Sequence, residues 1–333
     1  MKKLLYYLTG KEFLILSVIS LAMFYGLQKA GLFAEPPLSD MLILHGLAAR
    51  ILCSIIGVNA LFGIIRLYKE EKAYAGAVLF YMSLIVFAVA VWVSFYTRFE
   101  GRSLKAEGQS FGAFYGQFVP QTRHTAKYSK LPQIGLTLLK ISPEMTSDVK
   151  RLKNISIDVL YTGKGLQQVK ETKITNKMPF FLDWTFISIT DIGYAVKYQL
   201  KDQKGMNLED DIMFLKLFPP GTAEDYFETM FLGYLFNVRI YPDYADKGGI
   251  PTTLSAYLKN PVYNIRIVRN KDIVYNGLVK QEETVRFDRT AISLPRARLW
   301  VELTFVRDLG IPFALAGILL MITGLTLMAL KKQ

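Results

Sequence analysis

The fold class is decided by residues 73–97, which read AYAGAVLFYMSLIVFAVAVWVSFYT and contain no charged side chain. A helix rises 1.5 Å per residue, so this run is long enough to cross the roughly 30 Å hydrocarbon core of a bilayer. Residues 309–330, LGIPFALAGILLMITGLTLMAL, form a second charge-free run of the same kind. Mean hydropathy over the whole chain is also positive, at +0.24. The sequence therefore predicts an integral membrane protein.

Two further spans are predicted nearer the N-terminus. Residues 13–28 and 51–65 are shorter charge-free runs. Each can be extended, because Lys29, Arg50 and Arg66 stand at their ends, where long basic side chains reach the interface. We predict transmembrane helices near residues 10–30, 43–67, 74–97 and 309–330.

A cleaved signal peptide is the alternative interpretation of the first span. Lys2 and Lys3 give it a basic start, but Lys11 and Glu12 come before the apolar run. The following Leu32-Phe33-Ala34 is too bulky for a small-residue cleavage site. A retained helix is the preferred interpretation.

The basic residues predict the topology. They lie before the first span, in the loop 67–73 and in the tail 331–333, whereas the loop 31–42 contains only acidic charges. The positive-inside rule then places both termini in the cytoplasm. The predicted domains are three helices within residues 1–97, an extracytoplasmic (periplasmic) domain at 98–308, and a closing helix with its tail at 309–333. The predicted location is the cell (inner) membrane.

Strand-like patterns fill the large domain. Seven stretches are rich in β-branched and aromatic residues and mostly alternate apolar with polar: 154–161, 184–200, 236–241, 262–269, 273–279, 284–288 and 298–306. Arg269-Asn270-Lys271-Asp272 predicts a hairpin turn between two of them. Residues 222–234 predict one helix, with Thr222 as its N-cap. We expect a β-rich, β-sandwich-like domain, either undivided or split into lobes near residues 145/146.

Composition excludes several classes of function. The net charge is +12, but no block of five or six like charges and no nucleic-acid-binding motif occurs, so no nucleic-acid partner is predicted. Cys53 is the single cysteine, and His45 and His124 are the only histidines. These counts exclude a disulfide framework and a histidine-rich metal centre. Since no phosphate-binding loop, nucleophile elbow or zinc-protease motif is present, we predict neither catalytic nor metal-ligating residues.

The candidate site residues lie near the predicted outer end of the second span. His45 could ligate haem iron and Arg50 could contact a haem propionate. Both would equally serve as anchors in the headgroup region. His124 is expected in a surface loop.

Other polar and aromatic residues have simpler interpretations. Asn59 is expected to hydrogen-bond a neighbouring helix. The acidic triplet Glu209-Asp210-Asp211 could attract a cation, but an exposed turn explains it as well. An interfacial aromatic belt is preferred to a haem-contacting surface for four residues at the exit of the third span: Trp92, Phe95, Tyr96 and Phe99.

Several short motifs resemble those of one family of membrane proteins. They are the run from Ser83-Leu84 through Phe99-Glu100-Gly101-Arg102 to Glu107-Gly108-Gln109, the segment Ile174-Thr175-Asn176-Lys177-Met178-Pro179, the pair Gly193-Tyr194 with the turn Asp202 to Gly205, the residues Asn59 and Arg66, and Arg307-Asp308-Leu309-Gly310-Ile311-Pro312. Together with the order of spans and domain, they are similar to the ResB (also called CcsB) family of system II cytochrome c biogenesis.

The resemblance implies a function and partners. Family members are expected to work with a ResC (CcsA)-type haem-handling membrane protein, delivering haem and holding it near the haem-attachment motifs of apocytochrome c. The chain departs from the family at Tyr81, where a histidine is common. On this reading the chain is a non-catalytic subunit, and haem is shared transiently with the partner. The alternative is a membrane scaffold or chaperone for another extracytoplasmic assembly, without a haem role.

Overall fold

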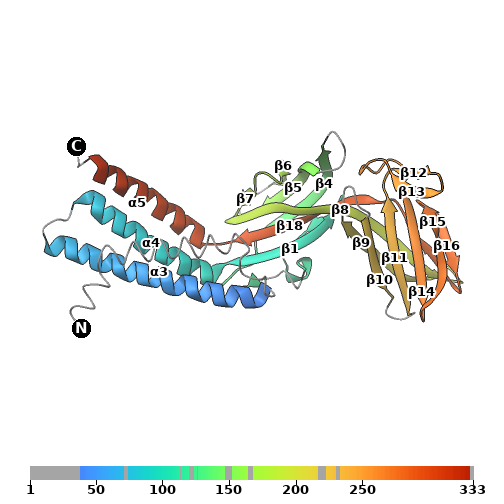
Figure 1. Cartoon of the computed structure of the whole chain (residues 1–333), viewed down its shortest axis with the longest axis horizontal. Coiled ribbons are helices and arrows are strands. Elements are labelled where there is room, and N and C mark those ends of the chain that lie inside the picture. Colours follow the sequence, from blue (N-terminus) through green and yellow to red (C-terminus); the bar gives the residue numbers. More distant parts are fainter. Residues whose placement is uncertain are drawn as a thin grey trace. The chain divides into compact units, whose positions relative to one another are not determined.

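The computed structural model describes residues 38–70, 74–112, 114–119, 124–125, 127–146, 152–163, 168–216, 223–229 and 233–330 (Figure 1). For residues 38–49, 115, 124–125 and 223 only the backbone is described. The chain divides into two compact units. One is helical and comprises Met1–Phe99, His124–Lys130 and Arg307–Gln333; the other comprises Glu100–Arg123 and Leu131–Val306 and is built of strands.

The described part of the helical unit contains three helices that are long and apolar enough to cross a membrane. They are α3 (Leu38–Lys69), α4 (Ala75–Thr97) and α5 (Gly310–Leu330). They overlap the spans predicted near residues 43–67, 74–97 and 309–330. The span predicted near 10–30 lies outside the described residues. The apolar helices support membrane association of the protein.

Glycines allow α4 and α5 to pack closely. The buried residues of α5 are Gly310, Gly317 and Gly324, seven positions apart and hence on one face of the helix. A Cβ added at Gly324 would lie 2.9 Å from the carbonyl oxygen of Gly76 in α4. Small residues let helix backbones approach, which matters where lipid tails remove the hydrophobic drive for helix association. The glycine face of α5 therefore specifies its partner helix.

The start of α5 is held by a buried carboxylate. Asp308 accepts a hydrogen bond from the backbone N–H of Gly310 at 2.8 Å, which caps the helix. Its other oxygen accepts the hydroxyl of Ser94 in α4 at 2.5 Å. The guanidinium of Arg98 lies 3.8 Å from the same oxygen. Asp308 thus connects the first turn of α5 to the last turn of α4.

Strands make up almost all of the second unit, so the predicted β-rich body is confirmed. They are β1 (Phe99–Ala106), β2 (Ser110–Phe111), β4 (Ile134–Met145), β5 (Leu152–Gly163), β6 (Lys170–Thr175), β7 (Phe180–Leu182), β8 (Thr185–Asp202), β9 (Asn207–Lys216), β10 (Ala223–Glu228), β11 (Tyr234–Tyr241), β12 (Tyr244–Lys247), β13 (Ile250–Thr253), β14 (Val262–Arg269), β15 (Asp272–Lys280), β16 (Thr284–Phe287), β17 (Thr290–Ser293) and β18 (Arg298–Arg307). The second unit also contains a 3-10 turn, η1 (Tyr115–Gln117), whereas the short strand β3 (His124–Thr125) belongs to the helical unit.

The long strand β8 organises this unit. It lies in a sheet of order β16-β17-β8-β18-β1, and β7 and β9 also pair with it (Figure 1). A second sheet has the order β2-β4-β5-β6, and a third has the order β10-β11-β14-β15. The hairpin of β12 and β13 forms a separate ladder. Because β8 spans 18 residues, its two halves belong to different parts of the core.

One apolar core joins the C-terminal half of β8 to the third sheet. Fully buried side chains from β8, such as Val196 and Leu200, pack in the same cluster as Phe236 of β11 and Ile265 of β14. The inward residues follow the period-2 alternation of a strand, as in β11, where alternate positions from Tyr234 onward are buried.

All seven predicted strands are confirmed, and so is the hairpin turn at Asn270 and Lys271. Both turn residues have positive φ, 49° and 74°, which suits the tight connection of β14 to β15.

The predicted helix and the predicted lobe boundary are wrong. The expected helix at 222–234 is replaced by β10 and the start of β11, which pair from Ala223↔Ile240 to Glu228↔Leu235. Ladder hydrogen bonds and the stacking of Phe227 on Phe236, 4.6 Å between centroids, outweigh its local helix propensity. Thr222 lies outside the described residues. A lobe boundary at 145/146 is also wrong, because β4 and β5 on either side of it form one antiparallel pair.

Candidate functional site

Arg50, one of the two predicted site residues, belongs to an arginine–aromatic cluster on α3 and α4. Its guanidinium lies 3.5 Å from the ring centroid of Phe95 and 5.8 Å from that of Trp92. Cation–π attraction at such distances contributes roughly 0.5–1 kcal/mol at exposed sites and more where water is excluded. The cluster, defined as Arg50, Ser54, Trp92, Phe95 and Tyr96, therefore places a positive charge over aromatic faces.

Hydrogen bonds fix the geometry of this cluster. The indole N–H of Trp92 donates to Oγ of Ser54 at 2.9 Å, and the Ser54 hydroxyl donates to the backbone carbonyl of Arg50 at 2.8 Å. Trp92 stacks on Tyr96 with 5.8 Å between centroids. Three of the four residues predicted as an aromatic belt thus lie together, whereas Phe99 is fully buried at the start of β1.

His45, the other predicted site residue, lies on α3 with its side chain outside the described part. Positions 45 and 50 differ by about 140° around the helix axis at 100° per residue, so they do not share one helix face. His124 lies in β3, again with only its backbone described.

The residue types of the cluster fit a flat ligand that carries carboxylates. Aromatic faces can stack on a porphyrin, and a guanidinium can pair with a propionate in bidentate fashion. A histidine imidazole on the same helix is a haem ligand by chemistry. The described part of the cluster, an arginine beside aromatic faces, is compatible with such a ligand, and His45 on another face of α3 is not part of it.

Tyr81, which stands where the resembled family has a histidine, lies between α3 and α4. A Cβ added at Gly63 of α3 would lie 2.6 Å from its ring, so the ring fills the space left by that glycine. Asn59 and Cys53 are both buried on α3. These positions contribute to helix packing.

The acidic triplet Glu209–Asp211 lies inside β9, so its interpretation as a turn is wrong. Tyr198 donates its hydroxyl to Glu209 at 2.6 Å, and Lys197 lies 3.1 Å from Asp210. The lysine and a hydrogen bond from Gln199 hold the pKa of Asp210 below its usual value, the Lys197 hydrogen bond being the largest cause. Across the described residues, no group of three or more His, Cys, Asp or Glu side chains is arranged to hold a metal ion.

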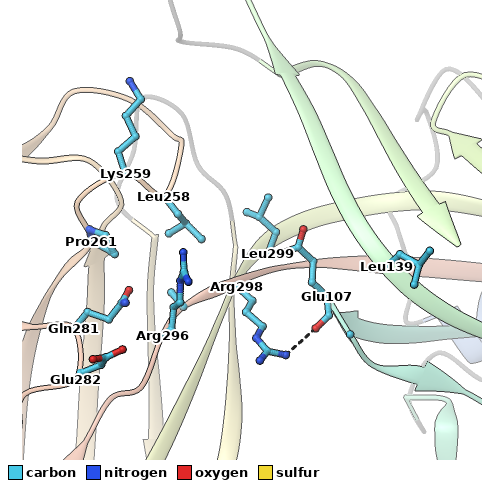
Figure 2. Close-up of a pocket in the computed structure, with 12 residues that line it drawn as sticks. Glu107, Leu139, Leu258, Lys259, Pro261, Gln281, Glu282, Arg296, Arg298 and Leu299 are labelled. Carbon is cyan, nitrogen blue, oxygen red and sulfur yellow. Dashed lines mark hydrogen bonds between the residues drawn. The ribbon is translucent and has the colours of Figure 1, made fainter.

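The β-rich unit contains a hollow of about 670 Å³ that sequence reasoning missed (Figure 2). Arg296 and Arg298 lie in its middle, with Glu282 on one side and Glu107 on the other. Arg298 donates to the backbone carbonyl of Glu107 at 3.1 Å. The remaining lining residues are Gly108, Leu139, Leu258, Lys259, Pro261, Gln281, Ala297 and Leu299.

A second hollow, of about 480 Å³, shares both arginines with the first. Lys197, Asp210 and Asp211 line it as well, so charges of both signs surround it. The signal in the sequence was Pro295-Arg296-Ala297-Arg298, two arginines beside a proline between two strands. Such mixed charge suits a polar chain with its own donors and acceptors, such as a peptide.

Comparisons with known proteins do not assign the chain to a family. The chain matches no protein-family model and no curated protein sequence. Among solved structures it is similar to "Cytochrome c Heme Lyase CcmF", with 9% identity and a TM-score of 0.26 over 95% of this chain and 34% of that one. The chain thus spans about a third of the length of that structure. A TM-score of 0.26 is too low to assign a common fold.

Proposed function

We propose that the protein is the membrane subunit of a ResB/ResC-type complex of system II cytochrome c maturation. One observation carries the proposal: α4 is followed after one residue by β1, and β18 is followed after two residues by α5. Apolar helices thus enclose a β-rich body in the chain, in the order that the sequence resemblance implies. The motifs around Phe99, Asn176 and Arg307 support the same family.

In this function the chain binds an apocytochrome segment, haem and a membrane partner. The β-rich unit offers strand edges and two charged hollows to an apocytochrome segment. Arg50 would orient haem by pairing with a propionate, and the aromatic rings beside it would exclude water, while His45, on another face of α3, is a separate candidate for holding haem iron. Haem itself supplies the vinyl groups that react with client thiols. A ResC (CcsA)-type protein is the proposed partner.

The membrane arrangement is part of the proposal. Residues near 10–30 form a fourth span, both termini are cytoplasmic, and residues 98–308 form the periplasmic domain. The distribution of lysine and arginine supports this orientation. A β-sandwich-like class for the domain is supported by the apolar core that β8 and β9 share with β11 and β14.

The test is a haem stain of membrane and periplasmic fractions from a deletion strain and its complemented parent. We expect covalently haem-bearing bands to disappear while apocytochromes are still made, as measured by immunoblot. Loss of a subset of bands would indicate a dedicated client. If every band persists in a strain with no second family member, the alternative of a scaffold without a haem role replaces the proposal.

The two candidate haem contacts are tested separately, because they lie on different faces of α3. His45→Ala is expected to abolish haem that copurifies with the complex, and Arg50→Ala to reduce it several-fold. Arg66→Ala is the matched control on the same helix, since Arg66 pairs with Glu70 at 2.6 Å. Equal haem content in the three variants and the parent would exclude both contacts.

A further inference from the structure

An exposed group of apolar side chains lies on the hairpin of β7 and β8. We name residues 178–187 the aromatic hairpin. Met178, Phe181 and Trp184 are 73%, 50% and 49% exposed. Phe181 packs on Phe186 across the strands at 4.9 Å and meets Trp184 edge-on at 6.0 Å. The three rings therefore form one continuous apolar surface.

The turn of this hairpin is an unfavourable place for tryptophan. Asp183 and Trp184 connect the strands with φ of 46° and 59°. Aspartate tolerates this left-handed region, but a bulky residue pays roughly 1–2 kcal/mol there, which glycine would avoid. Within the hairpin, the edge-on contact with Phe181 is the interaction that sets against this cost, and about half of the Trp184 side chain stays exposed.

The opposite face of the hairpin belongs to the core. Thr185 and Ile187 are fully buried, while Phe180 packs on Tyr161 of β5 at 5.1 Å. Alternation along the strands therefore turns Phe181 and Phe186 away from the protein interior.

The aromatic hairpin lies at a defined end of its sheet. Thr190 of β8 contacts Glu302 and Thr304 of β18, and Gly193 lies against Trp300, so the two strands are antiparallel. The start of β8 is consequently level with the end of β18.

Strand β1 follows the same arrangement. Arg102 pairs with Glu302 of β18 at 3.7 Å, and the N–H of Glu107 donates to the carbonyl of Leu299. The start of β1 thus also lies at the end of β18. At this end of the sheet, β1 and β18 are joined through one or two residues to the apolar helices α4 and α5.

We propose that the aromatic hairpin inserts Met178, Phe181 and Trp184 into the interfacial layer of the bilayer that α4 and α5 cross. Tryptophan is enriched at this depth because its ring is amphipathic, and Phe181 and Met178 add buried apolar area. The exposed Lys177 beside them suits anionic headgroups. The inference requires that the helices cross a membrane and is independent of the haem role.

Site-directed spin labelling tests the depth directly in the full-length protein. Cys53→Ser removes the single native cysteine, and Phe181→Cys then carries the nitroxide. The matched control is Lys271→Cys in the same background, on the β14–β15 hairpin, whose turn also has two non-glycine residues with positive φ. In phosphatidylcholine–phosphatidylglycerol vesicles, the label at 181 should be several-fold more accessible to oxygen relative to Ni-EDDA than the label at 271. Equal aqueous accessibility of the two labels overturns the proposal.

Tryptophan fluorescence gives a second measurement without a label. Trp184→Gly removes the ring and fits the turn conformation, so its thermal stability should equal or exceed that of the parent. The emission lost in this variant is the contribution of Trp184, and shallow-brominated lipids should quench it while aqueous iodide should not. Quenching by iodide, or protection from both quenchers by a protein partner, overturns the proposal.

Discussion

At the residue scale, Gly193 of β8 shows how little space the core leaves. A Cβ at this position would overlap the carbonyl oxygen of Leu215 and lie 2.5 Å from Nε1 of Trp300. Those two atoms already hydrogen-bond to each other at 2.8 Å. We predict that Gly193→Ala lowers the free energy of unfolding by about 3 kcal/mol, because backbone must move. Denaturant unfolding of the purified protein in detergent measures this change in the free energy of unfolding.

Gly277→Ala in β15 is the control for that prediction. Its Cβ would meet only the hydroxyl end of Tyr275, at 2.9 Å, and a flexible side chain can move away. We expect a change below about 1 kcal/mol. Equal effects of the two substitutions would show that Gly193 is not sterically required.

The arginine–aromatic cluster shows what the sequence predicts of single residues. The apolar run around 51–65 and its basic ends place Arg50 near the predicted end of a span. They do not reveal that its guanidinium lies over Phe95, because that contact joins residues 45 positions apart in two helices. Similarly, Arg296 and Arg298 belong to no catalytic motif, and only the fold shows that both arginines line two hollows.

At the scale of elements, the glycine face of α5 carries the second prediction. At Gly324 a new Cβ would lie 2.7 Å from the backbone nitrogen of Phe80, whereas at Gly317 it would meet the movable ring of Phe87 at 3.1 Å. Gly324→Ala should therefore destabilise the α4–α5 pair by about 1–3 kcal/mol, and Gly317→Ala by less than about 1 kcal/mol. Thermal unfolding in detergent ranks the variants; the reverse order would contradict this packing.

The capping carboxylate Asp308 carries the third prediction. Asp308→Ala leaves the N–H of Gly310 and the hydroxyl of Ser94 without their acceptor in a buried position. We expect a loss of about 1–3 kcal/mol, measured by thermal unfolding. Asp308→Asn keeps an acceptor and should recover about half of that loss. An alanine variant as stable as the parent would exclude this role.

Strands could be predicted from sequence where alternation was strong, as in β8, β11 and β14. The helix expected at 222–234 was wrongly predicted because the prediction used only the residues of that segment. The observed strand β10 is stabilised by pairing with β11. The β4–β5 pair joins neighbouring strands on either side of residue 145, but composition alone does not show which strands pair.

At the scale of the whole molecule, buried tyrosines couple the stability of the β-rich unit to pH. Burial raises the pKa of Tyr194, Tyr198 and Tyr263 far above the usual value near 10. The hydrogen bond to Glu209 raises the pKa of Tyr198 further. These phenols stay protonated in the folded protein and ionise in the unfolded chain. Their contribution to the free energy of unfolding is therefore complete below pH 10 and is lost as the pH rises further.

We therefore predict a melting temperature that is insensitive to these groups up to about pH 9.5 and falls steeply between pH 10 and 12. Each buried phenol lowers the free energy of unfolding by at most about 1.4 kcal/mol per pH unit above pH 10. Circular dichroism at the β-sheet minimum follows unfolding. Absorbance near 295 nm follows ionisation of tyrosine, and the buried tyrosines should ionise only as the unit unfolds. Phenolate absorbance from the buried tyrosines before any loss of structure would contradict the prediction.

Tyr198→Phe separates this titration from the deprotonation of lysines, which every variant shares. At pH 7 the variant loses the hydrogen bond to Glu209, 2.6 Å long in the parent, and should be less stable by about 1 kcal/mol. Above pH 10 it has one phenol fewer to keep protonated, so its stability should fall less steeply than that of the parent. The two stability curves are therefore expected to converge as pH rises, whereas parallel curves would show that Tyr198 ionises equally in the folded and unfolded chain.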